Sequence, residues 1–163
     1  YCRVTGVQTC ALPIYKKFAG SILGYEPISD RIISLRLNAR PRNVTLIQAY
    51  GPTTTAKEAD IESFYEDLSR AVKKTPKGDI LFVLGDFNAK VGARDSSAIT
   101  EAIGPYGLGE MNDAGEQLQD FCMEHELALA NTMFQQHPRR LYTWTSPDEK
   151  TRNQIDYITI AQK

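Results

Sequence analysis

The chain has 163 residues, of which 42% are hydrophobic, and its 19 Lys and Arg nearly balance its 20 Asp and Glu. This length suits one compact domain, and the apolar share argues against wholesale disorder. The longest apolar runs, such as Ile80–Leu84, are about five residues, too short to cross a membrane. A net charge of −1 excludes a polybasic tail, so a nucleic-acid partner would have to bind a local basic patch.

Residues 4–14 read VTGVQTCALPI and resemble the translation of a common sequencing-library adapter over their whole length. An ordinary N-terminal strand is the alternative interpretation. We expect residues 1–14 to be a non-native segment that is left out of fold reasoning, and residues 15–163 to form the domain. Cys2 and Cys10 then carry no information about the protein.

Three cysteines do not make a disulfide framework. The third, Cys122, lies in an apolar helical pattern and is expected to be a small core residue. The start of the chain lacks the basic flank and apolar core of a secretory signal. We therefore expect an intracellular protein, nuclear or cytoplasmic, with no membrane segment and no disulfide-linked partner.

From residue 31 onward the sequence alternates predicted strands and helices. Residues 31–37 and 43–50 are rich in β-branched and apolar residues. Residues 38–42 between them carry turn chemistry, so the two strands are predicted to form a hairpin. Pro52 is expected to end strand pairing after the second strand.

A helix is predicted next, because apolar residues recur at helical spacing between Ile61 and Val72. Thr55 and Glu58 before them fit a capping box. The helix is expected to end at Pro76. The apolar run from Ile80 to Leu84 then has strand length and is typical of a strand buried on both faces.

A second helix is predicted to begin at Asp113 and Glu116, after a mobile connection over residues 92–109. Its buried face would include Cys122. Three short strands are predicted at residues 127–130, 141–145 and 154–160. This alternation favours a layered α/β or α+β domain.

The strongest chemical signal is Asp86 and Asn88, directly after the apolar strand. Residues two apart share a face of a strand, so the two side chains are expected to lie on one side of the chain. Asp86 could accept a proton from water, and Asn88 could donate a hydrogen bond to an oxyanion. The alternative is an Asx turn that closes the strand.

Two further candidates lie at strand ends. Tyr50 ends the second hairpin strand, and its phenol could orient a phosphate or a leaving oxygen; a rim aromatic is the alternative. Asp156 lies in an otherwise apolar strand, where a carboxylate needs a partner. That partner could be a histidine that Asp156 orients, or an arginine such as Arg152, or backbone amides.

Four motifs in a fixed order carry a family resemblance. They are YGPT at residues 50–53, GDFN at 85–88, YTW at 142–144 and IDY at 155–157. Together they resemble the endonuclease/exonuclease/phosphatase superfamily, and in particular the apurinic-like endonuclease domain of RTE-type non-LTR retrotransposons. The resemblance covers about residues 15–163.

This resemblance implies an α/β sandwich in which two mixed β-sheets pack face to face with flanking helices. It also implies cleavage of a DNA phosphodiester with Mg²⁺ as cofactor. Asp86 would orient or deprotonate the attacking water, and Asn88 would hold the phosphate. Tyr50 would contact the scissile phosphate or leaving group, and Asp156 would orient a general histidine.

DNA is the partner that the resemblance implies. Thr143 would contact the DNA backbone, and Trp144 would lie near the base-facing surface. Arg139, Arg140 and Arg152 add a modest basic patch late in the chain. A solvated loop is the alternative interpretation of these arginines.

The sequence also departs from the family. A metal-binding Glu motif upstream of Tyr50 and a Ser-Asp-His motif after residue 157 are absent from these residues. His125 is expected on a helix surface and His137 in a loop. We therefore expect a domain that is incomplete at both ends, without the main metal ligand, and with little or no activity. A phosphatase of the same superfamily and a non-enzymatic fragment that acts through protein contacts are the alternatives.

Overall fold

The structure, a computed structural model, describes residues 14–93 and 101–162. Most of the expected non-native segment, residues 1–13, and the middle of the expected connection, residues 94–100, lie outside the described residues. The elements in chain order are η1 (Lys16–Ser21), β1 (Ile22–Pro27), β2 (Ile32–Leu37), β3 (Val44–Tyr50), α1 (Glu58–Lys74), β4 (Ile80–Asp86), α2 (Asp113–Glu124), β5 (Leu127–Leu129), α3 (Ala130–Met133), η2 (Pro138–Arg140), β6 (Trp144–Thr145), β7 (Arg152–Asn153) and β8 (Asp156–Ala161).

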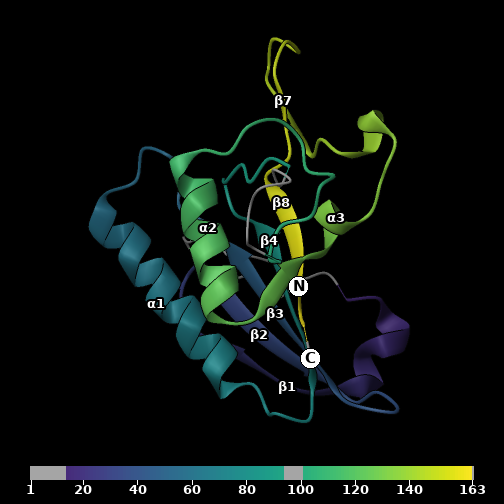
Figure 1. Ribbon diagram of the computed structural model, residues 1–163. Coiled ribbons are helices and arrows are strands. Elements are labelled where there is room, and N and C mark those ends of the chain that lie inside the picture. Colours follow the sequence, from purple (N-terminus) through teal and green to yellow (C-terminus); the bar gives the residue numbers. More distant parts are fainter. Residues whose placement is uncertain (1–13, 94–100, 163) are drawn as a thin grey trace.

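A six-stranded mixed sheet with the order β1-β2-β3-β4-β8-β5 forms the body of the protein. The predicted β2–β3 hairpin is confirmed as an antiparallel pair, and α1 makes the crossover that lets β3 and β4 run parallel. A second sheet, β6–β7, extends as a hairpin beyond the point where β8 begins (Figure 1). The predicted α/β fold class, with two sheets and flanking helices, is confirmed. The second sheet has two antiparallel strands, whereas a second mixed sheet packed face to face with the first was predicted.

The two faces of the large sheet differ in burial. Helices α1 and α2 cover one face (Figure 1), where Ile47 and Val83 are fully buried. The opposite face, which we call the open face, carries apolar side chains that are half-buried or exposed, and five of them matter below. They are Tyr25, Leu46, Phe82, Leu84 and Ile158. The prediction that β4 is buried on both faces was therefore wrong for one face.

The predicted core position of Cys122 is confirmed, since its side chain is a buried free thiol. Burial raises the pKa of this thiol to about 12. Leu118 and Phe121 of the same helix join Leu68 of α1 in one apolar cluster beneath the sheet. This cluster fixes α2 against the sheet and so supports the strands that carry the site.

The helix starts differ from the sequence prediction. The N-cap of α1 is Lys57, whose side chain makes no capping bond, and the hydroxyl of Thr55 lies 3.2 Å from that of Thr53. The N-cap of α2 is Asn112, whose Oδ1 accepts hydrogen bonds from the amides of Gly115 and Lys90. The capping side chain of α2 is therefore one residue earlier than predicted, and it also ties the helix to the loop after β4.

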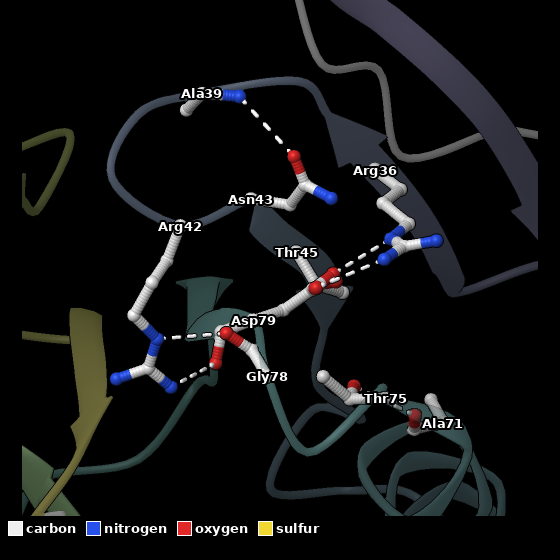
Figure 2. Close-up of polar contacts among 9 residues, drawn as sticks. All are labelled: Arg36, Ala39, Arg42, Asn43, Thr45, Ala71, Thr75, Gly78 and Asp79. Atoms are coloured by element: carbon white, nitrogen blue, oxygen red, sulfur yellow. Dashed lines mark hydrogen bonds and ion pairs between the residues drawn. The ribbon is translucent and has the colours of Figure 1, made fainter.

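A polar network fastens β2, β3 and β4 to one another at the end where β4 begins (Figure 2). The guanidinium of Arg36 donates two hydrogen bonds to the Asp79 carboxylate, at 2.7 and 3.0 Å, and the Thr45 hydroxyl donates a third at 2.8 Å. Arg42 donates to the carbonyls of Gly78 and Asp79. The bonds from Arg36 hold the pKa of Asp79 below its usual range. The network helps to fix the β3–β4 register.

Candidate functional site

Three of the predicted site residues form one row across the sheet. Tyr50 of β3 is the Cα partner of Asp86 of β4, and Asp86 is the Cα partner of Asp156 of β8. Partners in register project to the same face of a sheet, and directly opposite residues have Cβ atoms about 4.5–5.5 Å apart. The row lies on the open face, at the end where β3 and β4 finish. Residues predicted separately along the chain are thus brought together.

A hollow of about 450 Å³ lies over this row. Its lining includes Tyr50, Asp86, Asp156 and Thr143, which were predicted from the sequence, and Asn131, which was not. A larger hollow of about 1070 Å³ runs between α1 and α2, and none of the predicted site residues line it. The smaller hollow is therefore the candidate site.

The Asp86 carboxylate is half-buried, and its electrostatic surroundings are unfavourable to charge. Burial raises its pKa above the usual range, and the nearby negative charge of Asp156 raises it further. A hydrogen bond of 2.9 Å from the backbone amide of Asn88 acts in the opposite direction. The pair of carboxylates would therefore be stabilised by a proton or by a cation.

Asn88 lies differently from the prediction. Strand β4 ends at Asp86, and Asn88 has a φ of 50°, so the two-residue alternation of a strand does not reach it. The Asx turn that was the alternative interpretation is present, since Asp86 Oδ1 accepts the Asn88 amide. The Asn88 side chain donates from Nδ2 to the Gly51 carbonyl at 2.9 Å. It thereby joins the loops that follow β3 and β4.

The Asp156 carboxylate makes no hydrogen bond or ion pair with any residue in the ranges 14–93 and 101–162. Arg152, one proposed partner, instead places its guanidinium 4.7 Å from the centre of the Tyr142 ring. The backbone of Asp156, in contrast, is held on both sides by side chains. Thr143 Oγ1 accepts its amide, and Asn131 Nδ2 donates to its carbonyl. The interpretations that paired this carboxylate with Arg152 or with backbone amides were wrong.

Sequence reasoning missed two residues at the site. Arg31 donates to the carbonyls of Tyr50 and Gly51 at 3.4 and 3.5 Å, and its guanidinium lies 5.6 Å from the centre of the Tyr50 ring. The hairpin register could have indicated Arg31, because it immediately precedes β2 and its carbonyl accepts the amide of Tyr50 at the end of β3. Asn131 gave no local signal, since its partners are 25 and 27 residues away.

The predicted DNA-contacting residues other than Thr143 lie outside the hollow. Arg139 and Arg140 are exposed in η2, and Trp144 is 40% exposed in β6. Figure 1 shows η2 and the β6–β7 hairpin projecting at the end of the molecule where β8 begins. These residues thus lie on projections at the site end of the sheet.

Neither histidine lines the hollow. The prediction that His125 lies on a helix surface was wrong, because its side chain is only 6% exposed and Nε2 lies 2.8 Å from the Ser69 hydroxyl. Burial lowers the pKa of His125. His137 is an exposed N-cap residue of η2, as the loop prediction required.

In the described ranges, no helix is long and apolar enough to cross a membrane. Nor does any group of three or more His, Cys, Asp or Glu side chains gather there in a way that could hold a metal ion. The site itself offers two carboxylates, Asp86 and Asp156.

No family model matches the chain. Over 153 residues it is 49% identical to craniofacial development protein 2 of Tragulus javanicus and 48% identical to the protein of that name from Bos taurus. The chain is homologous to part of these proteins. The matches cover 94% of the chain but 26% and 25% of the two relatives, so it spans about a quarter of their length.

The fold is similar to that of the endonuclease domain of TRAS1, a telomere-specific non-LTR retrotransposon. The TM-score is 0.55 at 20% sequence identity, and the likeness covers 82% of this chain and 52% of that domain. At this level of sequence identity, the structural similarity shows the fold of the chain alone. The fold that the four short motifs indicated is thus confirmed.

Proposed function

We propose that the chain is part of a metal-dependent DNA endonuclease domain of the retrotransposon type, and that residues 15–163 are the portion derived from it. One observation carries the proposal: Tyr50, Asp86 and Asp156 form a cross-strand row beneath a hollow of about 450 Å³. A phenol donor and two carboxylates in one row suit the handling of a phosphate and its attacking water.

Asp86 is the candidate to orient or deprotonate the attacking water. Its raised pKa makes it a better proton acceptor than an ordinary carboxylate. Tyr50 would donate its phenol proton to the phosphate or the leaving oxygen. Asn88 uses one amide proton on Gly51, and the second could be donated to a phosphate oxygen. Asp156 would orient the histidine that the family resemblance implies.

The residues present fit Mg²⁺. This ion is commonly held by one or two carboxylates, with water and substrate phosphate completing its shell. Asp86 supplies a carboxylate whose pKa is raised chiefly by burial and further by the charge of Asp156, and a cation would offset both effects. When bound, Mg²⁺ would neutralise charge on the phosphate. The family's upstream Glu ligand is absent from these 163 residues.

DNA contact would rest on the projections around the site. Trp144 offers a partly exposed indole for stacking, and Arg139 and Arg140 offer exposed positive charges. Thr143 lines the hollow and would contact the DNA backbone. Since the whole chain has a net charge of −1, binding would depend on this local patch and would weaken as salt is added.

A plasmid-nicking assay tests the proposal, with the 163-residue chain beside full-length craniofacial development protein 2 of Bos taurus, in Mg²⁺ and in EDTA. We expect the longer protein to nick supercoiled DNA only with Mg²⁺. The chain should be slower by a factor of about 100 or more, because the upstream Glu and the general histidine are absent.

Three outcomes would contradict parts of this proposal. Robust nicking by the chain, lost in Asp86→Ala but kept in the exposed control Asp120→Ala, would refute the predicted low activity. If the longer protein does not cleave DNA but releases phosphate from inositol phosphates, the result would favour the phosphatase alternative. If the longer protein binds neither DNA nor metal and a stable protein partner is recovered, the result would favour the non-enzymatic alternative.

A further inference from the structure

A groove runs between α1 and α2, the helices that cover the face of the large sheet opposite the candidate site. It is the hollow of about 1070 Å³, lined by residues of α1 from Glu58 onward and by residues of α2, and we call it the helix groove. Ile61, Tyr65 and Phe121 give it an apolar floor, and the ring centres of Tyr65 and Phe121 are 5.7 Å apart. A hollow of this size with an apolar floor suits a peptide segment.

The charges along the helix groove are unevenly paired. Its three cations each have a carboxylate partner, since Arg70 pairs with Asp67, Lys73 with Glu124 and Lys74 with Glu26. Glu58, Glu62 and Glu66 form no ion pair with any residue in the ranges 14–93 and 101–162. They are exposed and recur every four residues, so they make one acidic ridge beside the apolar floor. This ridge is complementary to a segment that carries cations next to apolar side chains.

Such a segment is present at the start of η1. Tyr15 and Phe18 are 70% and 50% exposed, and the Phe18 amide donates to the Tyr15 carbonyl at 2.8 Å. Side chains three residues apart in a 3₁₀ turn lie on the same side, so the two rings are presented together. Lys17 Nζ lies 5.5 and 5.0 Å from the centres of these rings. Lys16 and Lys17 are exposed, and within the part of the chain that the structure describes neither forms an ion pair.

This segment is held away from the helix groove of its own chain. It leads directly into β1, whose pairing with β2 begins with Ile22 opposite Leu37. Figure 1 shows η1, in purple, and α1 on opposite sides of the molecule. Contact between the segment and the groove therefore requires two copies of the chain.

We propose that the helix groove of one copy receives residues 15–18 of a second copy. Tyr15 and Phe18 would lie over the apolar floor, with Lys16 and Lys17 beside the acidic ridge. Each copy carries one segment and one groove, so the contact is heterologous and can repeat head to tail. It is a small interface, and each contact is expected to be weak. The inference is independent of the proposed nuclease function.

A charge-exchange experiment with the whole chain tests the contact. The probe is a fluorescently labelled peptide of residues 15–22, and a second peptide carries Lys16→Glu and Lys17→Glu. Both peptides are titrated against the unaltered chain and against a groove variant with Glu62→Lys and Glu66→Lys, and binding is followed by fluorescence anisotropy.

The matched control variant carries Glu110→Lys and Glu149→Lys. These two glutamates are exposed and lie outside the helix groove, so the control variant has the same net charge as the groove variant. Melting temperatures show whether each variant is folded. If the groove variant is not, Glu62→Gln with Glu66→Gln takes its place, and it should weaken binding of the native peptide by about threefold or more.

We expect the native peptide to bind the unaltered chain and the control variant equally, and the groove variant at least about tenfold more weakly, because like charges then face each other. The reversed peptide should bind the groove variant at least about tenfold more tightly than the control variant. Both interactions should weaken as NaCl is raised from about 50 mM to about 500 mM, because the charges are exposed.

Equal binding of each peptide to the groove and control variants would overturn the proposal, and so would failure of the native peptide to bind the unaltered chain. Sedimentation velocity then decides whether the occupant is a second copy. In a chain that carries Ile158→Thr to limit association through the open face, adding Lys16→Glu and Lys17→Glu should lower the remaining association. If the peptide binds but this association is unchanged, the groove serves a basic segment of another protein and the contact between copies is refuted.

Discussion

Asp79 immediately precedes β4 and Asp86 ends it. The two carboxylates differ in whether their burial is compensated by hydrogen bonds. The Asp79 side chain is 3% exposed, and bonds from Arg36 and Thr45 compensate its burial. Asp86 is half-buried beside another carboxylate, with one backbone amide as its bond donor. The first residue therefore stabilises the fold, whereas the second retains unfavourable electrostatics that a substrate or cation could relieve.

The second residue-scale feature is the buried His125. Burial lowers its pKa, Lys73 lowers it further, and Glu124 raises it. The unfolded chain therefore takes up the proton first as pH falls below about 6.5, and the free energy of unfolding decreases through that window. We expect His125→Gln, which can still bond Ser69, to lose this acid sensitivity.

The measurement is the melting temperature at pH 7.5 and pH 5.5. The unaltered chain should lose about 2–4 °C more than His125→Gln between these values. His137→Gln is the control, because His137 is exposed and should leave the difference unchanged. Equal acid sensitivity in the His125→Gln protein would show that another group is responsible.

At the scale of elements, β4 depends on a glycine immediately before the site. Gly85 has a φ of 149°, and a Cβ there would lie 1.8 Å from the Ala49 carbonyl oxygen of β3. We expect Gly85→Ala to lower the free energy of unfolding by more than about 2 kcal/mol, because both the backbone conformation and the clash oppose it.

Urea denaturation measures this effect. The matched change is Gly24→Ala in β1, where a Cβ would meet nothing within 4 Å and φ is not in the left-handed region. That variant should lie within about 1 kcal/mol of the unaltered chain. If Gly85→Ala is as stable as Gly24→Ala, the prediction is contradicted, because β3 and β4 could then move apart without lowering the free energy of unfolding.

Sequence patterns predicted the elements in the middle of the large sheet well and those at its edges poorly. The β2–β3 hairpin, α1 and β4 follow from periodicity and turn residues, which are local. Strand β1 was missed, since most of its residues are exposed and show no alternation of burial. The hydrogen bonds from Asn131 to the backbone of β8 could not be predicted, because they join residues that are distant in the chain. Tyr50, Asp86 and Asp156 were found by motif, but their common row required the register.

On the scale of the whole molecule, the open face leaves apolar side chains uncovered. Tyr25 is 71% exposed and Ile158 is 48% exposed on the same face, with Phe82 and Leu84 half-buried near them. Exposed apolar patches of this kind promote association. We expect the chain to self-associate and to be poorly soluble, and Ile158→Thr to reduce that association by removing apolar surface while keeping a β-branched residue.

Sedimentation velocity over a range of concentrations measures this. Met123→Thr is the control, since Met123 is 47% exposed but lies on α2, which covers the opposite face. It should leave association unchanged. A monodisperse monomer that melts cooperatively in the unaltered chain would contradict the prediction.

The position of β8 between two other strands has a consequence for how the site forms during synthesis. β8 lies between β4 and β5, and Asp156 follows Asp86 by 70 residues. Until β8 has left the ribosome, β4 has no neighbour on that side and Asp86 stands without its opposite carboxylate. The site is thus assembled by one of the latest and longest-range pairings in the chain. A nascent or partly folded chain cannot hold the two carboxylates together, so any chemistry at this row depends on completion of the sheet.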